Sequence, residues 1–519
     1  MLASVALVAA LAALLGPAAL PARAAVLRLE AYDAEGKPLA GPDLLAHIAA
    51  RSGAGAAGAA RSGIYVTDLG DAPVPGRPWL VAGATQTWLA WEDASRVRVS
   101  LPWPVLEDGF STVFLDNGGA GYADGDAVLL NEAIAETQHR LFKESLDERL
   151  ASWEPNYRPS AKSRELIEQA HAAVAKARKE QAPDRRAAAY EKALARISAA
   201  WAKALFEHGG QVAAHPKLGP ALRWGLTLDE TLPSRLADFE RVAEDIRRSG
   251  ANWVRLVFRA NPEDFVYGNV RSFLEYDAAV KELTARKLHI MGSVLDSTQW
   301  TRSATAAQAA ARTRNIVLRY QDRIRSWEVA SEPNGDWLGG RKAPHPEELV
   351  RRALSESAAE VKRIDPTLET VATLYWWEGT ARDDRHPTFA WLKDAEPQGL
   401  FAKVDVVALS VYPDEHPMGM AFDTVFRKLH ARLPDKRLML GGFGYVEGKE
   451  LEGYWWLDPS DVDGARKDLL ILFTGAAAAT PRPLGGGFWW PTLSTMLNGR
   501  SDGESLARIY RRTLERLGR

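Results

Sequence analysis

The sequence contains no cysteine. This absence excludes disulfide bonds, thiolate metal sites and a lipid-modified cysteine, so packing alone must hold the folded chain together. The ten histidines form no H-E-x-x-H or H-x-H pair, and no catalytic metal is expected. No cofactor is expected either, because the glycines at 485–487 precede a predicted strand and do not fit a phosphate-binding loop.

An excess of charge of one sign is also missing, since the formal net charge is −2. That balance gives no indication of a nucleic-acid partner. With 519 residues, the chain is too long for one ordinary domain, and its hydrophobic content of 46% is enough to bury sizeable cores. The oligomeric state cannot be read from these features.

Long apolar runs are limited to the N-terminus, where residues 5–20 are followed by Ala22-Arg23-Ala24, an A-x-A cleavage pattern. We expect residues 1–25 to be a signal peptide. Export to the periplasm or the extracellular space would follow, with no membrane attachment after cleavage. Because no Lys or Arg precedes the apolar run, an uncleaved membrane anchor is the alternative.

Tryptophan, by contrast, is abundant, with eighteen residues. Residues 26–120 contain short alternating segments separated by Gly, Pro and Asp, which predicts a small β-sandwich. Its candidate sugar platforms, for which core packing is the preferred interpretation, are Trp79, Trp88, Trp91 and Trp103. Residues 121–215 predict a helical connector with helices over 127–153, 161–181 and 183–208.

Residues 216–519 alternate between apolar strand-like segments and amphipathic helical segments. The predicted strands are 223–228, 252–258, 289–295, 324–330, 370–375, 404–411, 437–441 and 486–490. The clearest predicted helices are 234–249, 276–286, 346–364, 422–433 and 464–477. Eight such units predict an α/β fold in which a C-terminal (β/α)8 TIM barrel follows the β-sandwich and the connector.

The C-terminal ends of barrel strands form one mouth, where reactive side chains are expected. Aromatic rings, an arginine and acids gather at these predicted ends, which suits a carbohydrate: its CH faces stack on rings, and its hydroxyls bind charged groups. Residues 327–334, Trp-Glu-Val-Ala-Ser-Glu-Pro-Asn, read as a strand that ends where an acid, Glu332, emerges before proline.

This octet resembles the fourth barrel strand of the clan A glycoside hydrolases, which usually ends in Trp-Glu-x-x-Asn-Glu-Pro. The resemblance implies that Glu332 is the acid/base catalyst, although Ser331 stands where the family usually has Asn. Residues 252–256 resemble the second strand, whose arginine, here Arg255, supports the nucleophile.

Two further strands resemble those of the same clan. Residues 405–412 are similar to the sixth strand, with Ser410 in place of the usual His while Tyr412 remains. Residues 488–490 match the eighth-strand region whose tryptophan floors the sugar site, which implies that role for Trp489.

The seventh strand departs from the family pattern, because Gly442 occupies the nucleophile's position within residues 438–445. A retaining glycosidase needs two carboxylates about 5 to 5.5 Å apart, and glycine supplies none. Three explanations are open: a substitute carboxylate, a 2-acetamido group of the substrate, or loss of hydrolysis. The candidates for a substitute carboxylate are Asp296, Glu447, Glu230 and Glu378.

The resulting hypothesis is an exported glycoside hydrolase-like protein acting on a β-linked poly- or oligosaccharide. The expected catalytic residues are Glu332, Asp296 and Tyr412, and the expected substrate-binding residues are Arg255, Trp300, Asn334, Trp337, Trp376, Tyr445 and Trp489. Glu328 is expected to form a buried pair with an arginine such as Arg255. The alternatives are a non-catalytic carbohydrate-binding protein and, more weakly, an assembly scaffold.

Overall fold

The structure is a computed structural model of the 519-residue chain. It describes residues 24–39, 41–48, 64–76, 78–82, 86–92, 95–106, 108–229, 236–259, 273–296, 305–335, 337–338, 346–378, 385–412, 417–444, 462–490, 492–497, 500–501 and 504–518. Within these ranges, no helix has the length and apolar character needed to cross a membrane.

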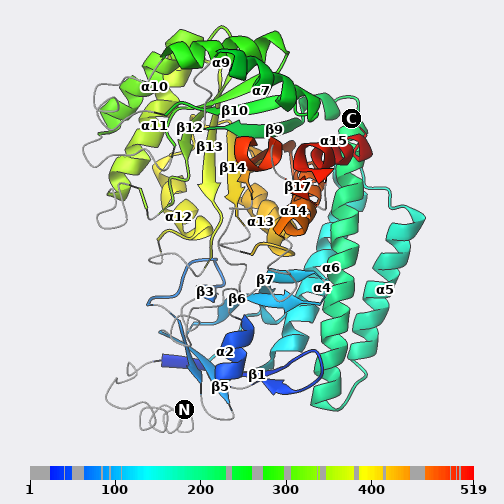
Figure 1. The fold of residues 1–519 in the computed structure, drawn as a ribbon. Helices are drawn as coiled ribbons and strands as arrows, with labels where there is room; N and C mark the ends of the chain where they lie inside the picture. Colours follow the sequence, from blue (N-terminus) through cyan, green and yellow to red (C-terminus); the bar gives the residue numbers. More distant parts are fainter. Residues whose placement is uncertain are drawn as a thin grey trace.

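Eight parallel strands close into a barrel in the upper part of Figure 1, in the order β10-β11-β12-β13-β14-β15-β16-β9. They are β9 (Arg223–Leu228), β10 (Trp253–Val257), β11 (His289–Ser293), β12 (Ser326–Ser331), β13 (Glu369–Tyr375), β14 (Val406–Val411), β15 (Arg437–Phe443) and β16 (Pro483–Trp489). Every strand lies within three residues of its predicted bounds at each end. The TIM-barrel prediction is therefore confirmed.

Helices surround the barrel because each presents an apolar stripe to the outer face of the strands. They are α7 (Leu236–Arg248), α9 (Phe273–Ala285), α10 (Ala306–Tyr320), α11 (Glu347–Ile364), α12 (Thr388–Ala395), α13 (Ala421–Arg432), α14 (Val462–Ala477) and α15 (Leu506–Arg516). The shorter elements of this region are η2 (Gly219–Ala221), η3 (Glu396–Gln398), η4 (Thr492–Leu497), β17 (Arg500–Ser501) and β18 (Glu504–Ser505).

The N-terminal part forms two separate sheets below the barrel (Figure 1). Its elements are β1 (Ala24–Tyr32), β2 (Pro38–Leu39), α2 (Pro42–Ile48), β3 (Tyr65–Asp68), β4 (Trp79–Ala82), β5 (Thr87–Glu92), β6 (Val97–Val105), β7 (Gly109–Leu115), η1 (Asn117–Gly119) and β8 (Ala127–Leu129). One sheet has the order β2-β1-β5-β4, with β8 also paired to β1, and the other has the order β3-β6-β7. Trp91 and Trp103 are fully buried, which excludes them as sugar platforms, whereas Trp79 and Trp88 are half-buried.

The connector consists of α4 (Leu130–Ala151), α5 (Ala161–Ala177) and α6 (Pro183–Ala214), which run alongside both other parts in Figure 1. The sequence predicts that the last helix ends before Gly209, but α6 continues to Ala214. Gly209 lies where α6 packs closely against α14, because a Cβ atom at Gly209 would lie 2.3 Å from the carbonyl oxygen of Gly475. Glycine here permits helix contact instead of ending the helix.

A second difference concerns residues 127–129, predicted as the start of a helix but found as strand β8. This short segment pairs in parallel with β1, where Arg28 lies opposite Ala127. The open edge of β1 supplies backbone partners that outweigh helix propensity over these few residues.

A buried ion pair joins the connector to the barrel. Arg149 of α4 and Asp423 of α13 are both 1% exposed and are hydrogen-bonded to each other. Arg149 also donates to Nδ1 of His208 at 2.8 Å and stacks over Trp153 at 4.0 Å. Burial, together with the charge of Arg149, lowers the pKa of His208 to about 4, so His208 is neutral near pH 7.

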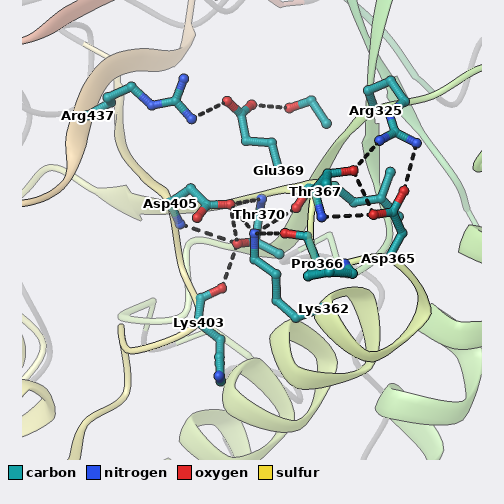
Figure 2. A network of polar contacts seen from close by, with 12 residues as sticks. Arg325, Lys362, Asp365, Pro366, Thr367, Glu369, Thr370, Lys403, Asp405 and Arg437 are labelled. Atoms are coloured by element: carbon teal, nitrogen blue, oxygen red, sulfur yellow. Dashed lines mark hydrogen bonds and ion pairs between the residues drawn. The ribbon is translucent and has the colours of Figure 1, made fainter.

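Polar contacts close the end of the barrel where the strands begin, opposite the mouth (Figure 2). Glu369 accepts hydrogen bonds from Arg223 and Arg437, both at 2.6 Å, and so links β9, β13 and β15. Asp405 accepts from Lys362 at 2.6 Å. Burial alone would raise the pKa of Asp405, but the Lys362 hydrogen bond contributes to a net lowering. Asp405 therefore has a structural role.

Candidate active site at the barrel mouth

Glu332 lies immediately after β12, at the mouth of the barrel. Its backbone has φ +55°, a left-handed conformation that is uncommon for a residue with a side chain. The backbone N–H of Glu332 donates to the carbonyl of Thr373 at 2.6 Å, and that of Ser331 donates to Leu295 at 2.9 Å. The neighbouring strands therefore fix the turn from which the Glu332 side chain, 9% exposed, projects.

The carboxylate of Glu332 is hydrogen-bonded to Ser410, the residue that replaces the histidine of the clan A pattern. The Ser410 hydroxyl donates to Oε1 of Glu332 at 2.7 Å and lies 3.4 Å from the carbonyl of Leu374. When the hydroxyl donates to the carbonyl of Leu374 instead, its oxygen can accept a hydrogen bond from a protonated Glu332. Ser410 can thus form a hydrogen bond with Glu332 whether Glu332 is charged or protonated. A general acid passes through both of these states.

Alternating charges line the ends of β9 to β12. In order they are Asp229, Arg259, Asp296, Arg255 and Glu328. Arg259 donates to Oδ2 of Asp229 at 2.5 Å and lies 3.7 Å from Asp296. Arg255 lies 3.8 Å from Asp296 on the other side. Asp296 is therefore paired with two guanidinium groups and is only 7% exposed.

Arg255 anchors this chain of charges beneath the Glu332 turn. It donates two hydrogen bonds to Oε2 of Glu328, at 2.9 and 2.7 Å, and one to Ser331 at 3.1 Å. Burial alone would lower the pKa of Arg255, but the charges of Glu328 and Asp296 raise it. Glu328 is fully buried, so the prediction that it pairs with Arg255 is confirmed.

Gly442 faces the same group of residues from β15. A Cβ atom at this position would lie 2.8 Å from the hydroxyl of Tyr412 and 3.6 Å from Cβ of Ser410. Ser410 therefore lies between Glu332 and the position where a nucleophilic carboxylate would begin. The Tyr412 hydroxyl occupies the space that such a side chain would enter.

Five aromatic rings surround the mouth, and we call them the mouth aromatics: Trp337, Tyr375, Trp377, Tyr412 and Trp490. Tyr375 and Tyr412 are stacked, with 6.1 Å between ring centroids, and Tyr412 meets Trp490 edge-on at 6.4 Å. The indole N–H of Trp490 donates to Asp229 at 2.9 Å, which ties the rings to the chain of charges. Trp337, Tyr412 and Trp490 are half-buried and offer ring surface for stacking.

Two predicted tryptophans point away from the mouth. Trp489 is fully buried, and its N–H donates to Thr495 at 2.8 Å. Trp376 is 1% exposed and lines a cavity beside the N-terminal sheets. The expected substrate-binding residues do not include Trp490 and Trp377, although strand alternation favours both. Phe488 faces the barrel interior and lies two residues before Trp490, and Val371, also interior, lies six residues before Trp377.

Asn334 also has a different role from the predicted one. Its side-chain N–H groups donate to the carbonyls of Tyr375 and His386, and its oxygen accepts from the N–H of Tyr375. The amide is fully buried, so it fastens backbone segments together instead of reaching a ligand.

Several remaining candidates cannot be placed at the mouth. Trp300, Tyr445, Glu230 and Glu447 lie outside the described residues. Glu378 lines the same cavity as Trp376, so it is not the substitute carboxylate. Among the described residues, no group of three or more His, Asp or Glu side chains could hold a metal ion.

No protein-family model and no curated protein matches the chain. Solved structures with a related fold include the endo-1,4-β-mannanase from Rhizomucor miehei, with 12% identity, TM-score 0.39, and coverage of 57% of this chain and 95% of that chain. The β-glucosidase from Thermotoga maritima in complex with castanospermine has 12% identity, TM-score 0.43, and coverage of 59% and 99%. The GH53 catalytic domain from Ignisphaera aggregans has 13% identity, TM-score 0.42, and coverage of 58% and 98%. The barrel assignment depends on the closed strand order of this chain and not on these likenesses.

Proposed function

We propose that the protein binds a β-linked poly- or oligosaccharide at the barrel mouth and hydrolyses a glycosidic bond. The observation that carries the proposal is the position of Glu332, an acid hydrogen-bonded to Ser410 beside the chain of charges and the mouth aromatics. Rings offer stacking faces to a sugar, and an acid that can exist in both protonation states can donate to a leaving oxygen.

In the proposed reaction, Glu332 protonates the glycosidic oxygen as the bond to the anomeric carbon breaks. Asp296 accepts a proton from the water that attacks that carbon, and the water oxygen forms the new bond. Because Gly442 supplies no nucleophile, the reaction would invert the anomeric configuration. Arg255 and Arg259 would hold Asp296 in place through its carboxylate oxygens.

The test is reducing-end release from a panel of β-linked polysaccharides by the wild type and by Glu332→Gln. A general acid contributes about 10²- to 10⁴-fold, so a loss of turnover in that range is expected while glycan affinity is kept. Asp296→Asn should lose turnover as well, and NMR of the first product should show the inverted anomer. Unchanged turnover in Glu332→Gln refutes the role of this acid.

A second candidate function, carbohydrate binding without hydrolysis, is favoured by one specific observation. The nucleophile's position is a glycine, and the Tyr412 hydroxyl stands 2.8 Å from where its Cβ would be. A barrel that keeps the mouth aromatics but has no second working carboxylate would hold a glycan and release it uncut.

Restoring a carboxylate distinguishes the two candidates. Gly442→Glu alone would meet the Tyr412 hydroxyl, so it is combined with Tyr412→Phe, which leaves the nearest ring carbon 3.7 Å from the new Cβ. Gly442→Ala with Tyr412→Phe is the matched control. Activity that appears only in the glutamate variant supports the binding function, whereas activity of the wild type supports hydrolysis.

We also propose that the protein is exported after removal of its N-terminal segment. Cleavage after residue 25 would leave Val26 as the first residue, still opposite Ala90 in the pairing of β1 with β5. N-terminal sequencing of protein from the culture medium or periplasm would show Val26 first. Retention of residues 1–25 in a membrane fraction would support an uncleaved anchor instead.

A further inference from the structure

A cavity of about 220 Å³ lies where the three parts of the chain meet. Its walls come from β3, β6 and β7 of the N-terminal sheets, from α4, and from the barrel at the end of β13 and along α12 and α13. We call it the junction cavity. The junction cavity is separate from the mouth. Its barrel residues, such as Trp376 and Thr424, belong neither to the mouth aromatics nor to the chain of charges.

Polar atoms in the wall of the junction cavity have no hydrogen-bond partner. Both carboxyl oxygens of Glu378 and the hydroxyl of Thr424 are buried in this state. The backbone N–H of Phe389 is close enough to Glu378 to affect its pKa, but it makes no hydrogen bond of normal geometry. Buried polar groups are normally satisfied by protein or by ordered water, so these groups are available to bind a molecule that enters the cavity.

The fully charged groups of the wall, in contrast, are already paired. Lys428 donates to Asp71 at 2.9 Å, and Arg98 lies 3.6 Å from the same carboxylate. Arg140 is hydrogen-bonded to Asp116. Even so, single atoms of these groups also lack a hydrogen-bond partner: Nε of Arg98, Nε of Arg140 and Oδ1 of Asp116. Glu378 and Thr424 add a carboxyl and a hydroxyl, which can bind the hydroxyl groups of a neutral ligand.

Burial raises the pKa of Glu378 to about 8, against a smaller lowering by the charge of Lys428. At neutral pH, Glu378 is therefore a protonated carboxyl that can both donate and accept a hydrogen bond. Rings complete the wall, with Trp376, Phe114 and Phe389 beside these groups. Aromatic faces next to paired donors and acceptors match the alternating CH faces and hydroxyls of a sugar ring.

We propose that the junction cavity is a second carbohydrate site that binds a single neutral sugar ring. In this site, Glu378 and Thr424 hydrogen-bond the sugar hydroxyls, and Trp376 packs against the ring. The volume agrees with this ligand class, because cavities for drug-sized ligands are larger, about 300 to 1,000 Å³.

The position of the cavity couples it to the mouth. Tyr375 and Trp377 belong to the mouth aromatics, whereas the alternating residues Trp376 and Glu378 line the junction cavity. A sugar held by Trp376 and Glu378 therefore contacts the backbone segment that carries two mouth rings. Occupancy of the cavity would fix the orientation of these rings.

The experiment is isothermal titration of the whole protein at pH 7 with four probes: D-glucose, D-galactose, D-mannose and D-xylose. At least one probe should bind, and Glu378→Leu and Thr424→Val should each weaken it tenfold or more. Trp490→Ala should affect only sugar that binds at the mouth, so the part of the binding that depends on Glu378 should keep its wild-type affinity in this variant. Loss in Trp490→Ala with retention in Glu378→Leu, or no binding of any probe to the wild type, overturns the proposal.

A conservative variant separates the site from a folding defect. Glu378→Gln keeps the shape and the neutral hydrogen-bonding groups, so binding at pH 7 should stay within about threefold of wild type. Wild-type binding should weaken as pH rises through about 8, where Glu378 ionises, and Glu378→Gln should lose that dependence. A wild-type profile that is flat to pH 9 contradicts the assigned role. If a sugar binds in the junction cavity but the protein cleaves no glycosidic bond, the junction site is supported and the proposed hydrolysis is refuted.

Discussion

At the scale of single residues, two acids on adjoining strands differ in what surrounds them. Glu332 follows β12 and has a hydroxyl partner, Ser410, at 2.7 Å. Glu378 lies just beyond β13 and has no partner for either oxygen. Burial without a partner disfavours charge on a carboxyl group, so the pKa of Glu378 is raised.

The raised pKa of Glu378 predicts a pH-dependent effect on stability. The carboxyl titrates near 4.5 in the unfolded chain and near 8 in the folded protein, so the folded state holds its proton more tightly. This stabilising contribution is complete below about pH 4.5 and is lost as pH rises through 8. Thermal unfolding of Glu378→Gln at pH 5, 7 and 9 should therefore show a Tm advantage over wild type that grows with pH.

An exposed acid provides the control for this measurement. Glu165 has a side chain that is 53% exposed and pairs with Lys162 and Gln169 nearby in the same helix. Glu165→Gln should shift Tm by a similar small amount at all three pH values. A Tm difference for Glu378→Gln that does not change between pH 5 and 9 contradicts the protonated state assigned to Glu378.

At the scale of elements, the eight barrel strands could be predicted because buried parallel strands are apolar runs separated by amphipathic helices. The direction of side chains beyond strand ends was predicted less well. Trp376 and Trp489 were placed at the mouth, yet alternation directs Trp377 and Trp490 there. The partners of Asn334 and the junction cavity depend on contacts between distant segments, which no local pattern encodes.

Trp489, the last residue of β16, and the next residue, Trp490, give a matched prediction at this scale. Trp490→Ala should weaken glycan binding tenfold or more with little change in Tm, because its ring is half-buried at the mouth. Trp489→Ala should cost about 3 to 5 kcal/mol of unfolding free energy, since it empties a buried site, while the folded fraction keeps its affinity. Glycan titration and denaturant unfolding measure the two effects. Weaker glycan binding in Trp489→Ala, with unchanged binding in Trp490→Ala, would show that Trp489 and not Trp490 contacts the glycan.

At the scale of the whole molecule, the connector and the barrel are joined by two ion pairs between the same helices, α4 and α13. Arg149 and Asp423 are 1% exposed, whereas Glu148, the partner of Arg427, is 46% exposed. Removing one partner of a buried pair leaves an uncompensated charge, whereas removing Glu148, the exposed partner of a pair in which Arg427 is 16% exposed, costs less.

Asp423→Asn should therefore lower the unfolding free energy by about 3 to 5 kcal/mol. Glu148→Gln, the matched control on the same pair of helices, should lower it by about 1 kcal/mol or less. Urea unfolding followed by tryptophan fluorescence measures both values, provided that each transition has a single phase. Equal losses in the two variants would show that the buried pair does not hold the connector to the barrel.

The left-handed backbone conformation of Glu332 affects how the thermostability of this protein can be engineered. Glycine or asparagine would adopt φ +55° more easily than glutamate, with a gain of about 1 kcal/mol. A thermostability screen that scores melting alone would thus reward replacing the acid that donates the proton in the proposed reaction. Position 332 should be held constant in any such library.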